Sequence, residues 1–178
     1  MKWWRTLTIA TLSCLGLLAP SALSAHAITG GEVDTTNQYS SVGLLMFYEN
    51  GGRFRCTATL VAPTVLLTAA HCTAGTSGKS LVNFDWNVAE APPSNIPAAA
   101  DPAAGYGDPD GDGIIVDAVS RTWYTGTAYA HPGYSDFTDL KNWNDVGVVI
   151  LDKPVTAVPY QLAPLGTLDS ITKSKLSH

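Results

Sequence analysis

The chain has 178 residues, of which 46% are hydrophobic and 14% are charged, and its formal net charge is −5. This length suits one domain of ordinary size, and the composition excludes a chain that is disordered throughout. Lysine and arginine form no basic stripe, so neither a nucleic acid nor an anionic membrane is expected as a partner.

The N-terminus has the three parts of a secretory signal peptide. Lys2 and Arg5 supply positive charge, residues 7–19 are apolar but too few to span a bilayer, and Ala25-His26-Ala27 has the small-x-small form of a cleavage site. We therefore predict that residues 1–27 are a signal peptide and that the mature chain is secreted, without a membrane anchor. Loss of Lys2 and Arg5 would take the formal charge from −5 to −7.

The remaining apolar segments are short and are separated by turn residues at intervals of about 8–12 residues, a pattern typical of all-β sandwiches and barrels. Glu49-Asn50-Gly51-Gly52 predicts a hairpin turn, because Asn-Gly accepts positive φ. No stretch has sustained helical periodicity. We predict strands at 39–48, 53–61, 65–69, 81–86, 114–122, 123–130 and 146–151.

Residues 91–113 interrupt this pattern and are rich in Pro, Ala, Gly and Asp. Prolines this dense exclude a central strand, so we expect a long surface loop inserted into the domain. Within it, Asp108, Asp110 and Asp112 alternate and Gly113 takes the sixth place, as at the opening of a calcium loop. The twelfth place holds Val119 instead of an acid. We therefore expect a solvated acidic turn and no cofactor, with a calcium site as the weaker alternative.

Two cysteines remain once Cys14 leaves with the leader. In a secreted chain, Cys56 and Cys72 favour one disulfide over a metal site, with two free thiols as the alternative. The loop that they close is short, so the bridge should stabilise the fold by roughly 3 kcal/mol.

His71 stands out because of its neighbours. It follows the apolar run of residues 65–69 and directly precedes Cys72. A disulfide at Cys72 would hold the backbone beside the imidazole in one place. A general base needs such fixation, since proton transfer requires hydrogen-bond reach of the nucleophile. His71 is therefore the candidate general base.

Several motifs follow one another along the chain. They are Ile28-Thr29-Gly30-Gly31, Cys56, Thr68-Ala69-Ala70-His71-Cys72, His131-Pro132-Gly133-Tyr134 and Asn144 to Leu151. Together they resemble the trypsin/chymotrypsin-type serine proteases, and they occur in the order found in that family. The resemblance covers about residues 28–165 and implies an all-β fold, an antiparallel Greek-key barrel that is the first of two, with the active site in the cleft between them.

The resemblance assigns roles to three residues. His71 matches the general base and acid, and Asp145 matches the carboxylate that orients the imidazole. Asp145 precedes the apolar residues 146–151, where a carboxylate needs a hydrogen-bond partner; a strand-end turn residue, like Asp152, is the alternative. Ile28 matches the new N-terminus, exposed by cleavage after Ala27, unless cleavage after Ser24 leaves a short pro-segment.

The family's nucleophile is a serine in a Gly-Asp-Ser-Gly-Gly segment, and the 178 residues contain no such segment. Ser77 lies in a polar stretch and fits no nucleophile pattern. We therefore expect residues 28–165 to be the first barrel of a secreted serine endopeptidase that acts on proteins or peptides, and 166–178 to begin a truncated linker to a missing second barrel.

Without that serine and its oxyanion hole, the chain as given should be inactive. Two alternatives belong to other classes of protein. One is a non-catalytic secreted binding protein built on a protease-like barrel. The other, which rests only on the aspartates of the inserted loop, is a calcium-dependent surface module.

Overall fold

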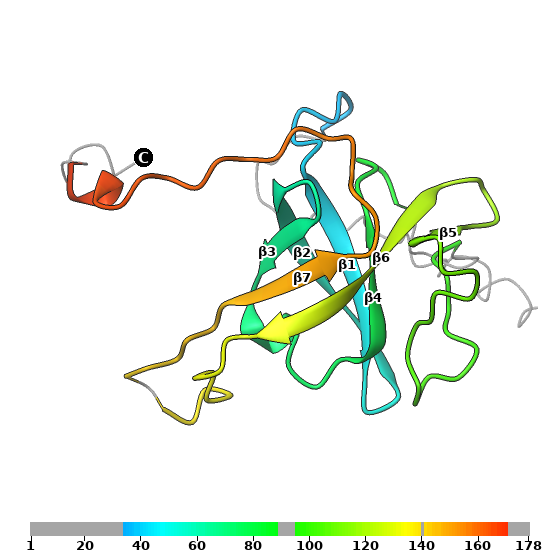
Figure 1. The fold of residues 1–178 in the computed structure, drawn as a ribbon, viewed down its shortest axis with the longest axis horizontal. Coiled ribbons are helices and arrows are strands. Elements are labelled where there is room, and N and C mark those ends of the chain that lie inside the picture. Colours follow the sequence, from blue (N-terminus) through cyan, green and yellow to red (C-terminus); the bar gives the residue numbers. More distant parts are fainter. Residues whose placement is uncertain (1–33, 89–94, 140, 171–178) are drawn as a thin grey trace, which may run out of the picture. The chain divides into compact units, whose positions relative to one another are not determined.

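The computed structural model describes residues 34–88, 95–139 and 141–170 (Figure 1). The predicted signal peptide, Ile28 and part of the inserted loop lie outside these residues. Among the described residues, no helix has both the length and the apolar character needed to cross a membrane.

Seven strands form one antiparallel sheet that closes on itself. The hydrogen-bonded order is β4-β1-β2-β3-β7-β6-β5, and β4 also pairs with β6, so six strands close a barrel to which β5 is added. The order β4-β1-β2-β3 is that of a Greek key, which confirms the predicted fold. The strands are β1 (Val42–Glu49), β2 (Gly52–Ala62), β3 (Val65–Thr68), β4 (Ser77–Asn83), β5 (Ile114–Val116), β6 (Thr122–Ala130) and β7 (Gly147–Leu151). Two 3-10 helices, η1 (Ala70–Cys72) and η2 (Thr167–Ser170), complete the described elements.

The almost continuous apolar run in β1 is explained by burial on both faces. Leu45 and Phe47 belong to the cluster that fills the barrel, whereas Met46 and Tyr48 belong to a second cluster. Ile96 and Tyr106, from the inserted loop, are buried in that second cluster. The described part of this loop contains no strand, as predicted, and it covers an outer face of the barrel.

The β1–β2 hairpin has the predicted turn. Asn50 and Gly51 have φ values of 49° and 77°, and Glu49 pairs with Gly52 across the hairpin. Positive φ at both central residues is the conformation that Asn-Gly favours.

Three predicted strands differ from the structure, and the one predicted at 39–48 begins only at Val42, after a turn. The prediction of one strand over residues 114–122 is wrong, because β5 ends at Val116 and a turn follows. Asp117 causes this turn: its carboxylate accepts hydrogen bonds from the amide N–H groups of Val119 and Arg121, at 3.0 and 2.9 Å. The strand predicted at 81–86 instead begins at Ser77 and ends at Asn83.

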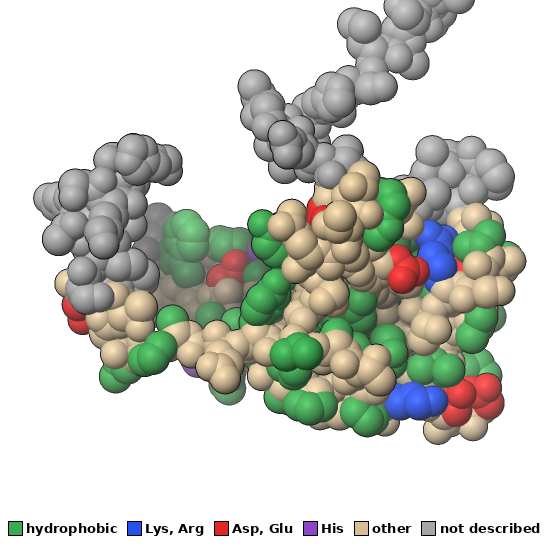
Figure 2. All heavy atoms as spheres, turned by 90° about the horizontal axis from the view of Figure 1, so that it is seen from above, with side chains coloured by type: hydrophobic (Ala, Val, Ile, Leu, Met, Phe, Trp, Pro, Cys, Tyr) green, Lys and Arg blue, Asp and Glu red, His purple; other side chains and the backbone are tan. Residues whose placement is uncertain are grey.

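Apolar side chains are exposed along β6, β7 and the stretch that follows them. Tyr129 and Ile150 are exposed, as are Val158 and Leu162 beyond β7. Figure 2, which shows the molecule from above, has hydrophobic side chains scattered over the visible face, together with acidic and basic side chains. Exposed apolar side chains that lie close together can mark a surface on which another part of a protein packs.

Candidate active site

His71 lies on the 3-10 turn η1, immediately beyond β3. The amide N–H of Cys72 donates to the Ala69 carbonyl at 3.2 Å, and that of Thr73 donates to the Ala70 carbonyl at 2.9 Å. Ala70 and Cys72 are buried, at 0% and 3% exposure. The side chain of His71, between them, is 48% exposed. The buried side chains of Ala70 and Cys72 therefore hold the turn against the barrel, and the imidazole between them faces outward.

The predicted disulfide is present and fixes this turn to the sheet. Cys56 of β2 is bonded to Cys72 of η1, across a sequence separation of 16 and a Cα–Cα distance of 6.2 Å. The two sulfur atoms also lie close to the ring nitrogens of His71. A metal would require thiolates, which disulfide sulfurs do not provide, so this group is not a zinc site.

Asp145 is held at a tight turn just before β7. Asn144 has a φ of 48°, and its side-chain amide donates to the Gly133 carbonyl at 2.9 Å. On the other side of the aspartate, the Val146 carbonyl accepts the amide N–H of His131 at 2.9 Å. Both neighbours of Asp145 are thus tied to the segment that follows β6, which fixes the position of the carboxylate.

The structure brings His71 and Asp145 together, although 74 residues separate them. Asp145 Oδ2 lies 2.8 Å from His71 Nδ1, and Oδ1 accepts the amide N–H of His71 at 2.9 Å. Partial burial opposes ionisation of Asp145, but the hydrogen bonds from the amide and ring of His71 outweigh that effect and lower the pKa of this carboxyl below its usual value. An ionised carboxylate on Nδ1 favours the tautomer with its proton on that nitrogen.

Three aromatic residues beside His71 were not predicted as part of the site. The Phe137 ring lies 5.9 Å from the imidazole, centroid to centroid, and makes edge contacts with Tyr134 and Trp143. Phe137 has a φ of 59°, an uncommon conformation for a bulky residue. The available signal in the sequence was the density of aromatic residues between His131 and Asp145.

The three aspartates of the inserted loop also lie together. One carboxylate oxygen from each of Asp108, Asp110 and Asp112 can be chosen so that all lie within 4.8 Å of one another. Asp108 Oδ1 is buried without a hydrogen-bond partner. However, the chain enters β5 at Ile114, and Val119, at the twelfth place, is exposed in the following turn. The loop therefore cannot continue around an ion as a calcium loop does.

Ser77 is not in the polar loop that was expected. It is the first residue of β4 and pairs with Tyr48 of β1. Ser77 is therefore a residue of the sheet and not of a loop.

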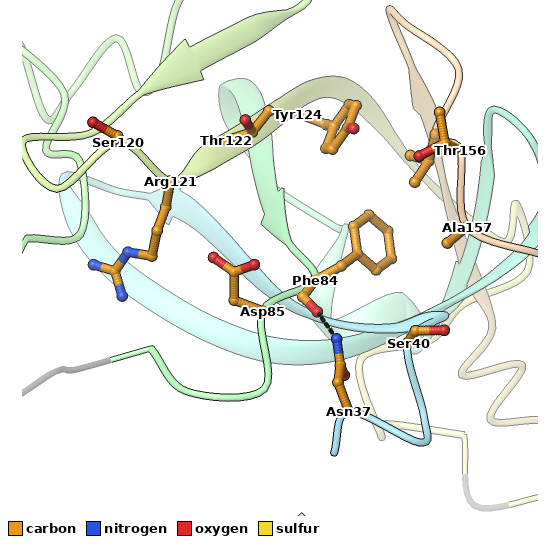
Figure 3. Close-up of a pocket in the computed structure, with 11 residues that line it drawn as sticks. Asn37, Ser40, Phe84, Asp85, Ser120, Arg121, Thr122, Tyr124, Thr156 and Ala157 are labelled. Carbon is orange, nitrogen blue, oxygen red and sulfur yellow. Dashed lines mark hydrogen bonds between the residues drawn. The ribbon is translucent and has the colours of Figure 1, made fainter. Parts of the chain in front are cut away.

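A hollow of about 430 Å³ lies near the start of β6 (Figure 3). Phe84, Arg121 and Tyr124 line it, and the side-chain amide of Asn37 donates to the Phe84 carbonyl at 3.1 Å beside it. His71 and Asp145 lie near the other end of β6, where Ala130 pairs with Gly147. None of the predicted site residues lines this hollow.

Comparison with known proteins finds no matching family model and no matching curated protein. Solved structures do match. GrC is 22% identical, with a TM-score of 0.46, over 76% of this chain and 49% of its own length. HL collagenase is 18% identical, with a TM-score of 0.48, over 76% of this chain and 47% of its own length. For the Vibrio cholerae VesB protease, the identity is 20%, the TM-score 0.43, and the coverage 75% and 33%.

The described strands form a closed antiparallel barrel, whatever the chain is compared with. The three solved structures are 18–22% identical to the chain, and their TM-scores are all below 0.5. The chain spans less than half the length of each of the three structures. At these identities and TM-scores the matches carry no argument about the fold or the activity, so the fold rests on the strand pairing and the chemistry of the site on its own residues.

Proposed function

We propose that this chain provides the first barrel of a secreted serine-type endopeptidase. His71 is its general base and acid, and Asp145 is the carboxylate that orients it. The observation that supports this proposal is the double contact of Asp145 with the ring and the amide of one histidine, at 2.8 and 2.9 Å. The Cys56–Cys72 disulfide supports the secreted location, because such bridges persist in oxidising compartments.

The geometry suits one chemical task. With Nδ1 held by Asp145, Nε2 is the nitrogen left to accept a proton from a serine hydroxyl and later to return it to the leaving amine. Asp145 then stabilises the imidazolium that forms between these steps. The half-exposed ring leaves room for a nucleophile and a peptide substrate on the Nε2 side.

The nucleophile and the oxyanion hole would come from a second barrel, since the 178 residues contain no Gly-Asp-Ser-Gly-Gly segment. The exposed apolar side chains on β6, β7 and the stretch after β7, such as Tyr129, Ile150 and Leu162, would provide part of the surface on which that barrel packs.

Three experiments test the proposal. The 178-residue chain should show no turnover of casein and no labelling by a serine-reactive phosphonate; labelling of any serine would contradict the proposed division of roles. The coding sequence beyond the codon for His178 should encode Gly-Asp-Ser-Gly-Gly, in the same or a shifted frame. In a protein extended to include it, Asp145→Asn should lower kcat by about 10⁴-fold, because the wrong tautomer is then favoured.

A non-catalytic secreted binding protein is the second candidate, favoured by the same missing segment. A stop codon after His178 followed by unrelated sequence would support it. In that case His71→Ala and Asp145→Asn would leave binding of the partner unchanged, whereas in a protease both substitutions would lower turnover by several orders of magnitude.

A further inference from the structure

We propose that Gly147 is a positioning residue for the His71–Asp145 pair. Its missing side chain lets the turn that carries His71 lie directly against β7, two residues beyond Asp145. The consequence for proton transfer rests on the proposed function, but the effect on the pair itself can be measured without any substrate.

The contact between Gly147 and the turn is unusually close. A Cβ atom added to Gly147 would lie 2.7 Å from the Ala69 carbonyl oxygen and 2.9 Å from Thr73 Cγ2, and closer still to Thr73 Oγ1. Ala69 and Thr73 flank η1, so both ends of the His71 turn rest on this one glycine. Its neighbours in the sequence, Val146, Val148 and Val149, are all β-branched residues typical of a strand. A glycine within such a run often marks the close approach of another backbone.

Neither partner can move away easily. Gly147 pairs with Thr68 of β3 on one side and with Ala130 of β6 on the other, so β7 is held by two neighbouring strands. Thr73 is 4% exposed, and its hydroxyl donates to the Ala70 carbonyl at 3.0 Å. A side chain at residue 147 must therefore displace the turn as a unit.

The movement of the His71 turn that a Cβ at residue 147 would cause is large enough to break the hydrogen bond between His71 and Asp145. Ordinary van der Waals contact begins near 3.4 Å, so the Ala69 carbonyl would retreat by 0.7 Å from its distance of 2.7 Å. The same movement applied to the 2.8 Å separation of His71 Nδ1 and Asp145 Oδ2 would give about 3.5 Å, where little of a hydrogen bond remains. Since Asp145 belongs to the segment that enters β7, pushing the turn away from β7 separates the pair.

The test uses the whole chain with ¹⁵N-labelled histidine and follows the Nδ1–H proton resonance of His71, assigned through its loss in His71→Ala. In Gly147→Ala this resonance should disappear or exchange with water at least tenfold faster. The matched control is Gly126→Ala in β6, where an added Cβ would meet the Ile150 carbonyl at 2.8 Å, far along the strand from the pair. The control should lose stability but keep the resonance.

A second variant relieves the crowding. Thr73→Ala removes both side-chain contacts with residue 147, so Gly147→Ala/Thr73→Ala should fold and recover part of the resonance, even if Gly147→Ala alone unfolds. A wild-type resonance in Gly147→Ala would overturn the inference. Equal loss of the resonance in Gly147→Ala and Gly126→Ala would also overturn the inference. The same holds if the folded double variant recovers none of the resonance. None of these results depends on catalysis. Failure of the proposed protease function would therefore leave the inference about Gly147 intact, and failure of this inference would leave the proposed function intact.

Discussion

Removal of the Cys56–Cys72 cross-link should destabilise the barrel by an amount that follows from the chain itself. A sequence separation of 16 corresponds to a loop-closure contribution of about 3 kcal/mol at 25 °C, through restriction of the unfolded chain. Total stabilities of domains this size are about 5–15 kcal/mol, so the bridge accounts for a substantial fraction. Reduction should therefore shift the urea midpoint markedly downward.

Two perturbations separate the cross-link from the packing of its sulfur atoms. Reduction keeps both sulfurs, whereas Cys56→Ala/Cys72→Ala removes them, and Cys72 is a member of the barrel cluster with 3% exposure. The double variant should therefore lose about 1 kcal/mol more than the reduced chain, through the cavity left behind. Equilibrium urea unfolding of the oxidised, reduced and double-variant chains, at one pH, measures both differences.

Loss of the Cys56–Cys72 disulfide should also affect the candidate active site. Because Cys72 directly follows His71, loss of the bridge frees one end of η1, and the Nδ1–H proton of His71 should exchange faster with water. Equal urea midpoints for the oxidised and reduced chains would refute the loop-closure reasoning. A lower midpoint with unchanged exchange at His71 would show that the bridge stabilises the barrel without fixing the turn.

Two further outcomes are expected. Burial opposes ionisation of Asp117, but hydrogen bonds from Trp123, the amide of Arg121 and its guanidinium outweigh burial and lower the pKa of Asp117 to about 2. A pKa below the unfolded value near 4 gives about 2 kcal/mol of stability, which is present above pH 4 and lost as the pH falls to 2. Asp117→Asn should remove that part of the pH dependence of unfolding, whereas the exposed Asp110→Asn should not; equal curves for Asp117→Asn and wild type would contradict this. Millimolar calcium should leave the melting temperature unchanged, because the loop holding Asp110 passes into β5 before it could surround an ion; a rise that Asp110→Asn abolishes would show a calcium site instead.

Most of the barrel could be predicted because its local signals agree with its tertiary contacts. The Asn50-Gly51 turn has the φ values that its residues favour, and β1 is apolar throughout because both of its faces are buried. The strand predicted at residues 114–122 was wrong because here the local sequence signal and the actual contacts disagree. Asp117 lies among strand-forming residues, but its carboxylate satisfies the turn amides and two side chains, and no periodicity reveals that.

The sequence predicted which residues carry the chemistry of the site, but not all the contacts that hold these residues in position. The sequence order of the motifs pointed to His71, Asp145 and the disulfide, and the structure joins the first two through hydrogen bonds. The contact of Gly147 with Thr73 was not predictable, since it depends on how closely two segments distant in the sequence approach each other. Phe137 was missed for a similar reason: the sequence shows aromatic residues gathered between His131 and Asp145, but not that one of these rings lies beside the imidazole.

Three contacts hold the His71 turn, one from β2 and two from the segment that enters β7. The disulfide ties Cys72 to β2, the backbone of Gly147 supports the turn on β7, and Asp145 binds both the amide and the ring of His71 from the turn before β7. Because all three lie within one barrel, the orientation of the imidazole does not depend on a nucleophile being present. In the proposed protease, the orienting part of the triad would thus be complete before a second barrel packs, and the step left to that packing would be to bring a serine hydroxyl within hydrogen-bond reach of Nε2.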